Sequence, residues 1–80
     1  MTKKEKNILE QALYKATLME LRKKDAMKND KSKAARKIAE GAAAWARATE
    51  DLFRQLLPKE AEGLAAIKEE AANTFELEKG

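Results

Sequence analysis

The sequence predicts an all-α fold, a long antiparallel helical hairpin followed by a shorter third helix. Its 80 residues include one proline and three glycines and are rich in alanine, lysine, glutamate and leucine, a composition typical of helices. Apolar residues recur at helical spacing, and no alternating strand pattern is present. We expect a single helical domain over residues 1–80, packed as a three-helix bundle or as a dimer of helical hairpins, because so short a chain buries a small core.

The first helix is predicted from about residue 4 to residue 27, with Thr2 or Asn7 as a suitable cap. At 100° per residue, one apolar stripe forms on this helix. Its members are Ile8, Leu9, Ala12, Leu13, Ala16 and Met19. A smaller apolar patch lies roughly opposite and consists of Tyr14, Leu18 and Leu21. We expect a third helix, a dimer partner or another protein to cover this patch.

Residues 28–33 are predicted to form an elbow between the first two helices, with Asp30 or Ser32 capping the second. Residues 22–37 contain eight basic and two acidic side chains, a net charge of +6, whereas the whole chain carries +3. Such a basic elbow is suited to phosphate or another anionic surface, or it is simply a solvated loop. The cations considered for contact are Lys23, Lys24, Lys28, Lys31, Lys33, Arg36 and Lys37.

The second helix is predicted from about residue 32 to residue 57, and its apolar residues follow heptad spacing. One column contains Ala35, Ala42, Thr49 and Leu56, a second contains Ile38, Trp45 and Leu52, and Ala39, Ala46 and Phe53 lie beside them. The pattern predicts close helix approach near the elbow and a larger core at the other end. Trp45, in the second column, is predicted to be a core residue.

Pro58 is expected to end the second helix and to occupy the first turn of a third helix, from about residue 59 to residue 77. The apolar stripe of this helix is thin, because Lys68 lies within it and Asn73 and Thr74 interrupt it. It is therefore predicted to be the least firmly packed of the three helices.

Several classes of function have no support in the sequence. The chain contains no cysteine and no histidine, which removes disulfides, the commonest general base and the commonest metal ligands. No glycine-rich phosphate loop or nucleophile motif is present. We expect no enzymatic activity, no cofactor and no metal. No apolar run approaches the roughly 18 residues of a membrane span, and no apolar segment typical of a signal peptide follows residues 1–6, so we expect a cytoplasmic protein.

The sequence favours a small non-enzymatic interaction module, a regulator or adaptor, that binds another protein through Tyr14, Leu18 and Leu21. The alternative is a regulator that binds nucleic acid and contacts phosphates through the basic elbow at residues 22–37. A peripheral membrane role for the first helix is the weakest of the three interpretations, because three glutamates interrupt its basic charge. A homo-oligomer is compatible with each interpretation.

The first twelve residues resemble the start of the Rop family of plasmid copy-number regulators, which are dimers of helical hairpins that bind paired RNA loops. The matching residues are Met1, Thr2, Lys3, Glu5, Lys6, Leu9 and Ala12. Among the RNA-facing positions of that family, Lys3 matches and Tyr14 keeps an aromatic side chain. Glu10, Leu18 and Asp25 depart from the family, and the rest of the chain, including the third helix, does not follow it. The resemblance implies RNA contact by the first helix.

Overall fold

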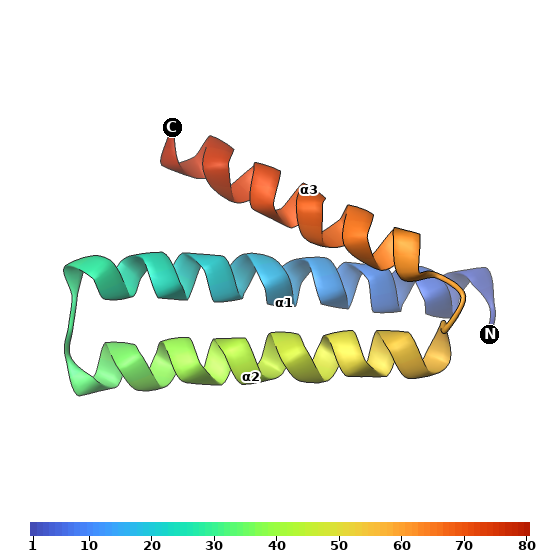
Figure 1. Ribbon diagram of the computed structural model, residues 1–80, viewed down its shortest axis with the longest axis horizontal. Coiled ribbons are helices and arrows are strands. Elements are labelled where there is room, and N and C mark those ends of the chain that lie inside the picture. The colour runs from blue at the N-terminus through green and yellow to red at the C-terminus, as the bar shows by residue number, and fades with distance from the viewer.

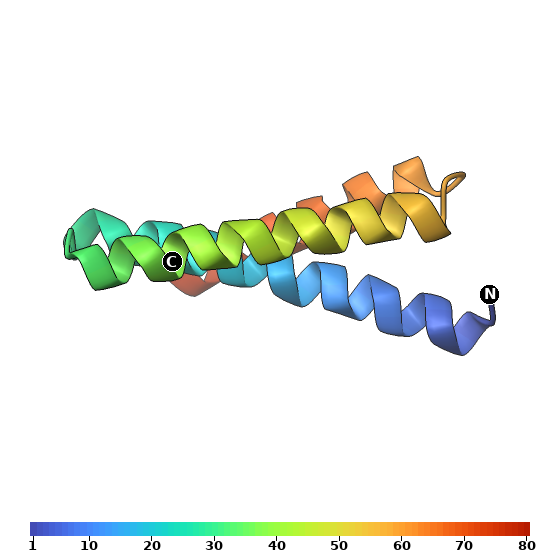
Figure 2. The same cartoon turned by 90° about the horizontal axis from the view of Figure 1, so that it is seen from below.

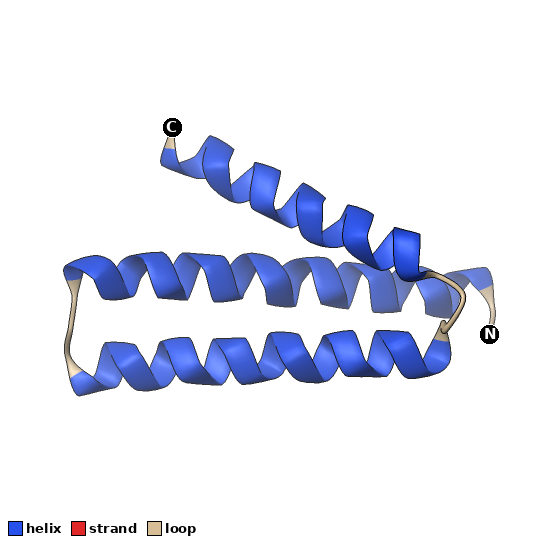
Figure 3. Cartoon of the chain, in the orientation of Figure 1, coloured by secondary structure: helices blue, strands red, loops and turns tan.

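The computed structural model describes residues 1–80 and consists of three helices joined by short turns, without strands (Figures 1 and 3). The helices are α1 (Lys3–Asn29), α2 (Lys33–Leu56) and α3 (Ala61–Lys79). The all-α prediction is confirmed, and each helix begins and ends within two residues of its predicted position. α1 and α2 form an antiparallel hairpin, and α3 crosses α1 obliquely (Figures 1 and 2). α3 packs mainly against α1 and only slightly against α2.

The first two helices begin at side-chain caps. Thr2 Oγ1 accepts a hydrogen bond from the Glu5 backbone N–H at 3.1 Å, and Glu5 Oε1 accepts one from the Thr2 backbone N–H at 3.3 Å. This reciprocal pair is a capping box. Ser32 Oγ caps α2 by accepting from the Ala35 N–H at 3.1 Å. The connection between α1 and α2 is therefore only residues 30–32, shorter than the predicted elbow at residues 28–33.

Pro58 lies in a turn between α2 and α3. The Glu60 N–H donates to the Leu57 carbonyl at 3.0 Å, which places Pro58 at the second position of a β-turn. The ring of proline fixes the φ angle that this position requires. The prediction that Pro58 occupies the first turn of α3 is therefore wrong, since α3 begins three residues later at Ala61.

The core is small, because only 12 of the 80 residues are buried. It forms at the end of the hairpin away from the α1–α2 turn, where all three helices meet. Its members are Leu9 and Leu13 of α1, Phe53 of α2 and Leu64 of α3, with Leu57 and Ile67 packed against them. Toward the α1–α2 turn the two helices meet through small buried residues, Ala16, Ala39, Ala42 and Ala46. Alanines at this seam allow the two backbones to lie close together.

The seam between α1 and α2 is rotated relative to the predicted heptad pattern. Ala39, Ala46 and Phe53 are all buried, whereas Trp45 is 63% exposed and Leu52 is 46% exposed. The prediction that Trp45 is a core residue is therefore wrong. Because the two helices approach through alanines, the seam is narrow and the neighbouring column of large side chains lies outside it. The predicted apolar stripe of α1 is also only partly buried. Leu9, Leu13 and Ala16 are buried, whereas Ile8 and Met19 are exposed.

Polar contacts add to a small apolar contact between α3 and the hairpin, since Leu64 and Ala71 are the only buried residues of α3. The Tyr14 hydroxyl and Thr74 Oγ1 share a hydrogen bond of 2.7 Å. Four ion pairs also join α3 and the turn before it to the hairpin. They are Lys6–Glu60 at 2.9 Å, Glu50–Lys68 at 3.2 Å, Asp25–Lys79 at 3.8 Å and the pair Arg22–Glu78. Exposed pairs of this kind contribute little individually and weaken as salt rises.

We expect acid to weaken the attachment of α3. The hydrogen bond from Arg22 lowers the pKa of Glu78 below its ordinary value of 4.5. Burial acts to raise the pKa of Glu50, but hydrogen bonds from Arg54 and Lys68 outweigh it and the net pKa is lowered. A carboxylate with a lowered folded-state pKa stabilises the fold above its ordinary pKa, and this contribution disappears as the pH falls through the lowered value.

The thermal midpoint, followed by circular dichroism, should therefore decrease as the pH is lowered from about 6 to about 3. A Glu78→Gln variant should lose part of this pH dependence, while Glu62→Gln, which removes a carboxylate without an ion pair in the same helix, should keep it. Equal pH dependence in Glu78→Gln and in the unchanged chain would contradict the role assigned to the Arg22–Glu78 pair.

Gly41 lies within α2, and a Cβ added there would meet no atom within 4 Å. Glycine inside a helix costs roughly 0.5–1 kcal/mol relative to alanine. Gly41→Ala should therefore raise the free energy of unfolding by about that amount, measured as a higher urea midpoint with an unchanged slope. A destabilised Gly41→Ala protein would mean that the space beside Gly41 is already occupied in the folded state.

Candidate functional site

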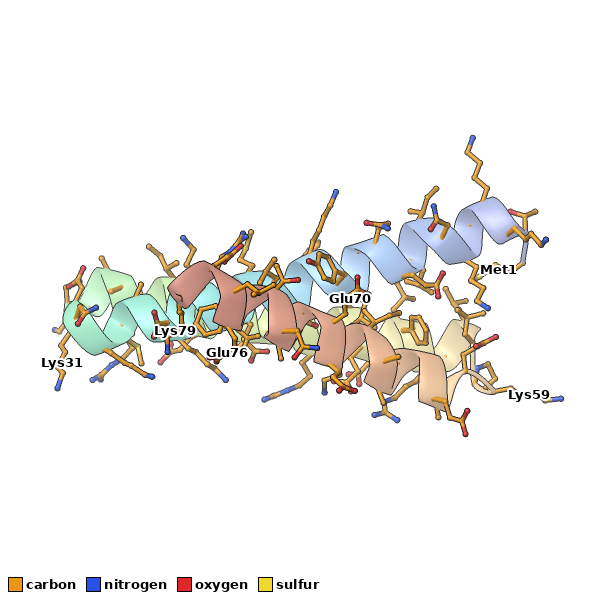
Figure 4. All side chains as sticks on the ribbon, turned by 90° about the horizontal axis from the view of Figure 1, so that it is seen from above. Met1, Lys31, Lys59, Glu70, Glu76 and Lys79 are labelled. Atoms are coloured by element: carbon orange, nitrogen blue, oxygen red, sulfur yellow. The ribbon has the colours of Figure 1, made fainter.

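The basic elbow lies at one end of the molecule, with Lys31 at its tip (Figure 4). Its seven proposed contact residues are all exposed. Lys24 pairs with Glu20 at 3.0 Å and Lys28 with Asp25 at 3.7 Å. The other five have no carboxylate within 4 Å, and they are Lys23, Lys31, Lys33, Arg36 and Lys37.

The turn at the elbow is well ordered by its own hydrogen bonds. Asp30 Oδ1 accepts from the Ser32 N–H at 3.0 Å, and this bond lowers the pKa of the Asp30 carboxyl. Together with the Ser32 cap, it ties the connection to the start of α2. The elbow cations therefore project from two helix ends that a short, hydrogen-bonded turn joins.

The patch proposed for protein binding, Tyr14, Leu18 and Leu21, lies beneath α3. Tyr14 bonds to Thr74, and Arg22, eight residues further along the same row, pairs with Glu78. Leu18 lies between these two contacts and is 6% exposed, while Leu21 is half-buried. This patch is therefore not free apolar surface. The third helix of the same chain covers it, which was one of the coverings expected from the sequence.

A different apolar surface is exposed on the other side of the hairpin, and we call it the outer face. It comprises Ile8, Ala12 and Met19 of α1 and Ile38, Trp45, Leu52 and Leu56 of α2. Its six large side chains are between 46% and 63% exposed. At 100° per residue they project about 120–160° away from Tyr14 and Glu50, two residues that contact α3. The outer face and α3 therefore lie on opposite sides of the hairpin.

The outer face contains an open hollow where Trp45 faces α1. The hollow is lined by Asn7, Ile8, Gln11, Ala12, Lys15 and Trp45. Beside the large column of α2 runs a column of small residues at the same seven-residue spacing, Ala34, Gly41 and Ala48. Alternating large and small columns form the ridges and grooves into which another helix packs.

The charge along the α1 edge of the outer face is mostly basic. Lys4, Lys15 and Lys23 each lie three or four residues from an outer-face residue of α1, so they border it. None of the three has a carboxylate within 4 Å. Glu5 is the one acidic residue near this edge, and its hydrogen bonds with Thr2 lower its pKa and hold it at the start of α1.

The opposite side of the molecule is acidic. Residues 58–80 contain six glutamates and three lysines, and Glu70 and Glu76 lie along α3 in Figure 4. The molecule thus has an acidic helix on one side of the hairpin and an apolar face bordered by lysines on the other.

The outer face was missed from the sequence, although one signal for it was present. The apolar positions of α2 extend over an arc of about 140°, from the column of Trp45 to that of Ala39 and Phe53. A helix that contacts one neighbour needs a stripe of about 100°. The surplus width indicates that one edge of the stripe contacts something other than α1.

The molecule contains no group of three or more acidic side chains placed to hold a metal ion. A polar hollow between α1 and α3 brings Glu10 and Glu70 near Tyr14. None of the three helices combines the length and the apolar composition needed to cross a membrane.

No protein-family model, curated protein or solved structure matches this chain.

Proposed function

We propose that this chain is a small non-enzymatic interaction module, a regulator or adaptor, that binds another protein through the outer face. The observation that carries the proposal is Trp45, which is the only tryptophan of the chain and is 63% exposed. It lies between Ile38 and Leu52 in the same column and faces Ile8 across the hollow. The proposed docking residues therefore differ from Tyr14, Leu18 and Leu21.

Physical chemistry favours a protein partner for such a surface. Soluble monomers rarely expose large contiguous apolar patches, and six large apolar side chains on one side of this hairpin are about half exposed. Tryptophan is among the residues that contribute most to binding when a partner covers them. Burial of the outer face by a partner would contribute hydrophobic free energy to binding, because these side chains are not buried in the core of this chain.

Site-specific photo-crosslinking tests the proposal. A photoreactive phenylalanine analogue at position 45, on the outer face, should give discrete crosslinks to another protein in cells of the source organism. The same analogue at the exposed neighbouring position 44, which points about 100° away, should not. Leu52→Glu should remove the crosslink from position 45. Equal crosslinking from both positions, or crosslinks only between copies of this chain, would contradict the proposal.

A second candidate function is contact with nucleic-acid phosphates by the basic elbow. It is favoured by four elbow cations without carboxylate partners in the α1–α2 turn and the first turns of α2, which are Lys31, Lys33, Arg36 and Lys37. No aromatic residue lies among them to stack on bases. Such binding would therefore depend on charge and shape, with little reading of sequence.

Anisotropy of labelled duplex DNA, single-stranded DNA and hairpin RNA measures this second function. Binding to one form should weaken steeply between low and moderate salt. A Lys28→Gln, Lys31→Gln, Lys33→Gln triple variant should bind less tightly, with a shallower salt dependence by about one unit of slope for each phosphate contact removed. Its thermal midpoint should not change, because all three side chains are exposed. Absence of binding at low salt would exclude this function.

A further inference from the structure

We infer that the occupant of the outer face is an acidic amphipathic helix of the partner protein. The inference rests on the proposed function and adds the shape and the charge of the segment that docks. Three features of the molecule lead to it: the form of the outer face, the distribution of charge around it, and the way in which α3 is held on the other side of the hairpin.

The form of the outer face fits a helix. Ile38 and Leu56 mark its two ends on α2 and lie 18 residues apart, a distance of about 27 Å along the helix axis. The large column through Trp45 and the small column through Gly41 run along this length. Apolar side chains at heptad spacing on a helix of about five turns would alternate with these columns. Because Gly41 has open space beside it, the backbone of the partner helix can come close there.

The charge distribution selects an acidic helix. Lys4, Lys15 and Lys23 border the α1 edge, and Lys15 also lines the hollow beside Trp45. These three lysines have no acidic partner in the chain. A second copy of the chain placed face to face would bring the same three lysines, and the one carboxylate at this edge, Glu5, is held at the start of α1 by its hydrogen bonds with Thr2, so like-charge contacts would outnumber opposite-charge contacts. Three lysines border the α1 edge, whereas the α2 edge has small residues with Lys37 beside them. This arrangement suits a helix with acidic residues on one flank better than an evenly charged lipid surface.

The attachment of α3 is an example, within the chain, of an acidic helix that pairs with basic residues of α1. α3 is an acidic helix that packs on the opposite side of α1, where Glu60 at its N-cap pairs with Lys6 and Glu78 pairs with Arg22. Lys4, Lys15 and Lys23 recur along α1 in a comparable way on the outer side. The partner helix would pair with them as α3 pairs with Lys6 and Arg22, and the hairpin would then lie between two acidic helices.

The test uses the emission of Trp45, the only tryptophan, and two synthetic helical peptides of about five turns without tryptophan. One peptide carries leucines at heptad spacing with glutamates on one flank, and the other has lysines in place of the glutamates. The acidic peptide should shift the emission to shorter wavelength with saturation, and it should bind about tenfold more tightly than the basic peptide, which three exposed ion pairs can supply.

A matched pair of variants separates the effect of the lysines that border the outer face from the effect of the net charge of the chain. Lys15→Glu with Lys23→Glu should remove or reverse the preference for the acidic peptide. Lys31→Glu with Lys33→Glu changes the net charge of the chain equally but lies at the elbow, so the preference should remain. Retention of the preference in the first variant, or its loss in both, would overturn the assignment to Lys15 and Lys23.

Each other outcome also decides the inference. Equal binding of both peptides would overturn the acidic character of the occupant, while crosslinking from position 45 would still support the proposed function. No emission shift with either peptide would overturn the inference that the occupant of the outer face is a helix. A shift that depends only on the concentration of the protein, with a dimer in sedimentation, would assign the face to a second copy. A shift with vesicles of anionic lipid but not with the peptides would assign it to a membrane surface.

Discussion

Phe53→Ala is expected to destabilise the fold by about 3–5 kcal/mol, the usual cost of removing a buried phenylalanine ring. Phe53 is 1% exposed and joins Leu9 and Leu13 of α1 to Leu64 of α3. It therefore lies where the three helices meet, and its loss leaves a cavity that each of them lines. For a chain of 80 residues the total stability is about 4–12 kcal/mol. Urea unfolding followed by circular dichroism should show a loss of about a quarter or more of the free energy of unfolding, as a much lower urea midpoint than that of the unchanged chain.

The matched control is Trp45→Ala, which removes a larger aromatic side chain from the same helix. Because Trp45 is mostly exposed, its loss should cost about 1 kcal/mol or less. The structure therefore predicts that the larger truncation has the smaller effect. Similar losses from both variants, or a larger loss for Trp45→Ala, would show that α2 is rotated the other way about its axis, as the heptad pattern first suggested.

Ala46→Leu is expected to destabilise the fold by about 1–3 kcal/mol, the usual cost of adding methylene groups to a filled contact. Ala46 is buried in the narrow seam opposite α1, where Thr17 and Glu20 lie near it. A leucine there would push the two helices of the hairpin apart. Thermal unfolding should show a lower midpoint, and the near-ultraviolet circular dichroism of the aromatic residues should weaken.

Ala44→Leu provides the comparison for Ala46→Leu, because Ala44 is exposed and points away from the seam. The same enlargement there should change the free energy of unfolding by no more than about 0.5 kcal/mol. If both leucines were tolerated equally, the close approach of α1 and α2 through alanines would be refuted.

Much of the fold follows from local sequence signals. Alanine-rich helical periodicity, the capping residues Thr2 and Ser32 and the helix-terminating Pro58 act over a few residues. They therefore fix the helices and their ends without knowledge of tertiary contacts. The interpretation of Tyr14, Leu18 and Leu21 depended on what covers them. A third helix was one of the expected coverings, but the thin apolar stripe of α3 did not single it out, because α3 is also attached by ion pairs and by the Tyr14–Thr74 hydrogen bond.

The rotation of α2 could not be predicted because two neighbouring columns were both apolar. Heptad spacing indicates which residues share a face, but the choice between the columns of Trp45 and of Ala46 depends on how closely α1 approaches. The buried alanines show that the close approach is preferred. The candidate site changes with this choice, since the same rotation that buries Ala46 exposes Trp45.

The measurement that tests the exposed outer face most directly is quenching of Trp45 fluorescence by acrylamide in dilute protein, with sedimentation at the same concentration to identify the monomer. The structure predicts red-shifted emission and quenching close to that of a free tryptophan derivative, because 63% of the side chain is exposed. Blue-shifted emission with strong protection from acrylamide in the monomer would place Trp45 in the core and contradict the assignment of the outer face.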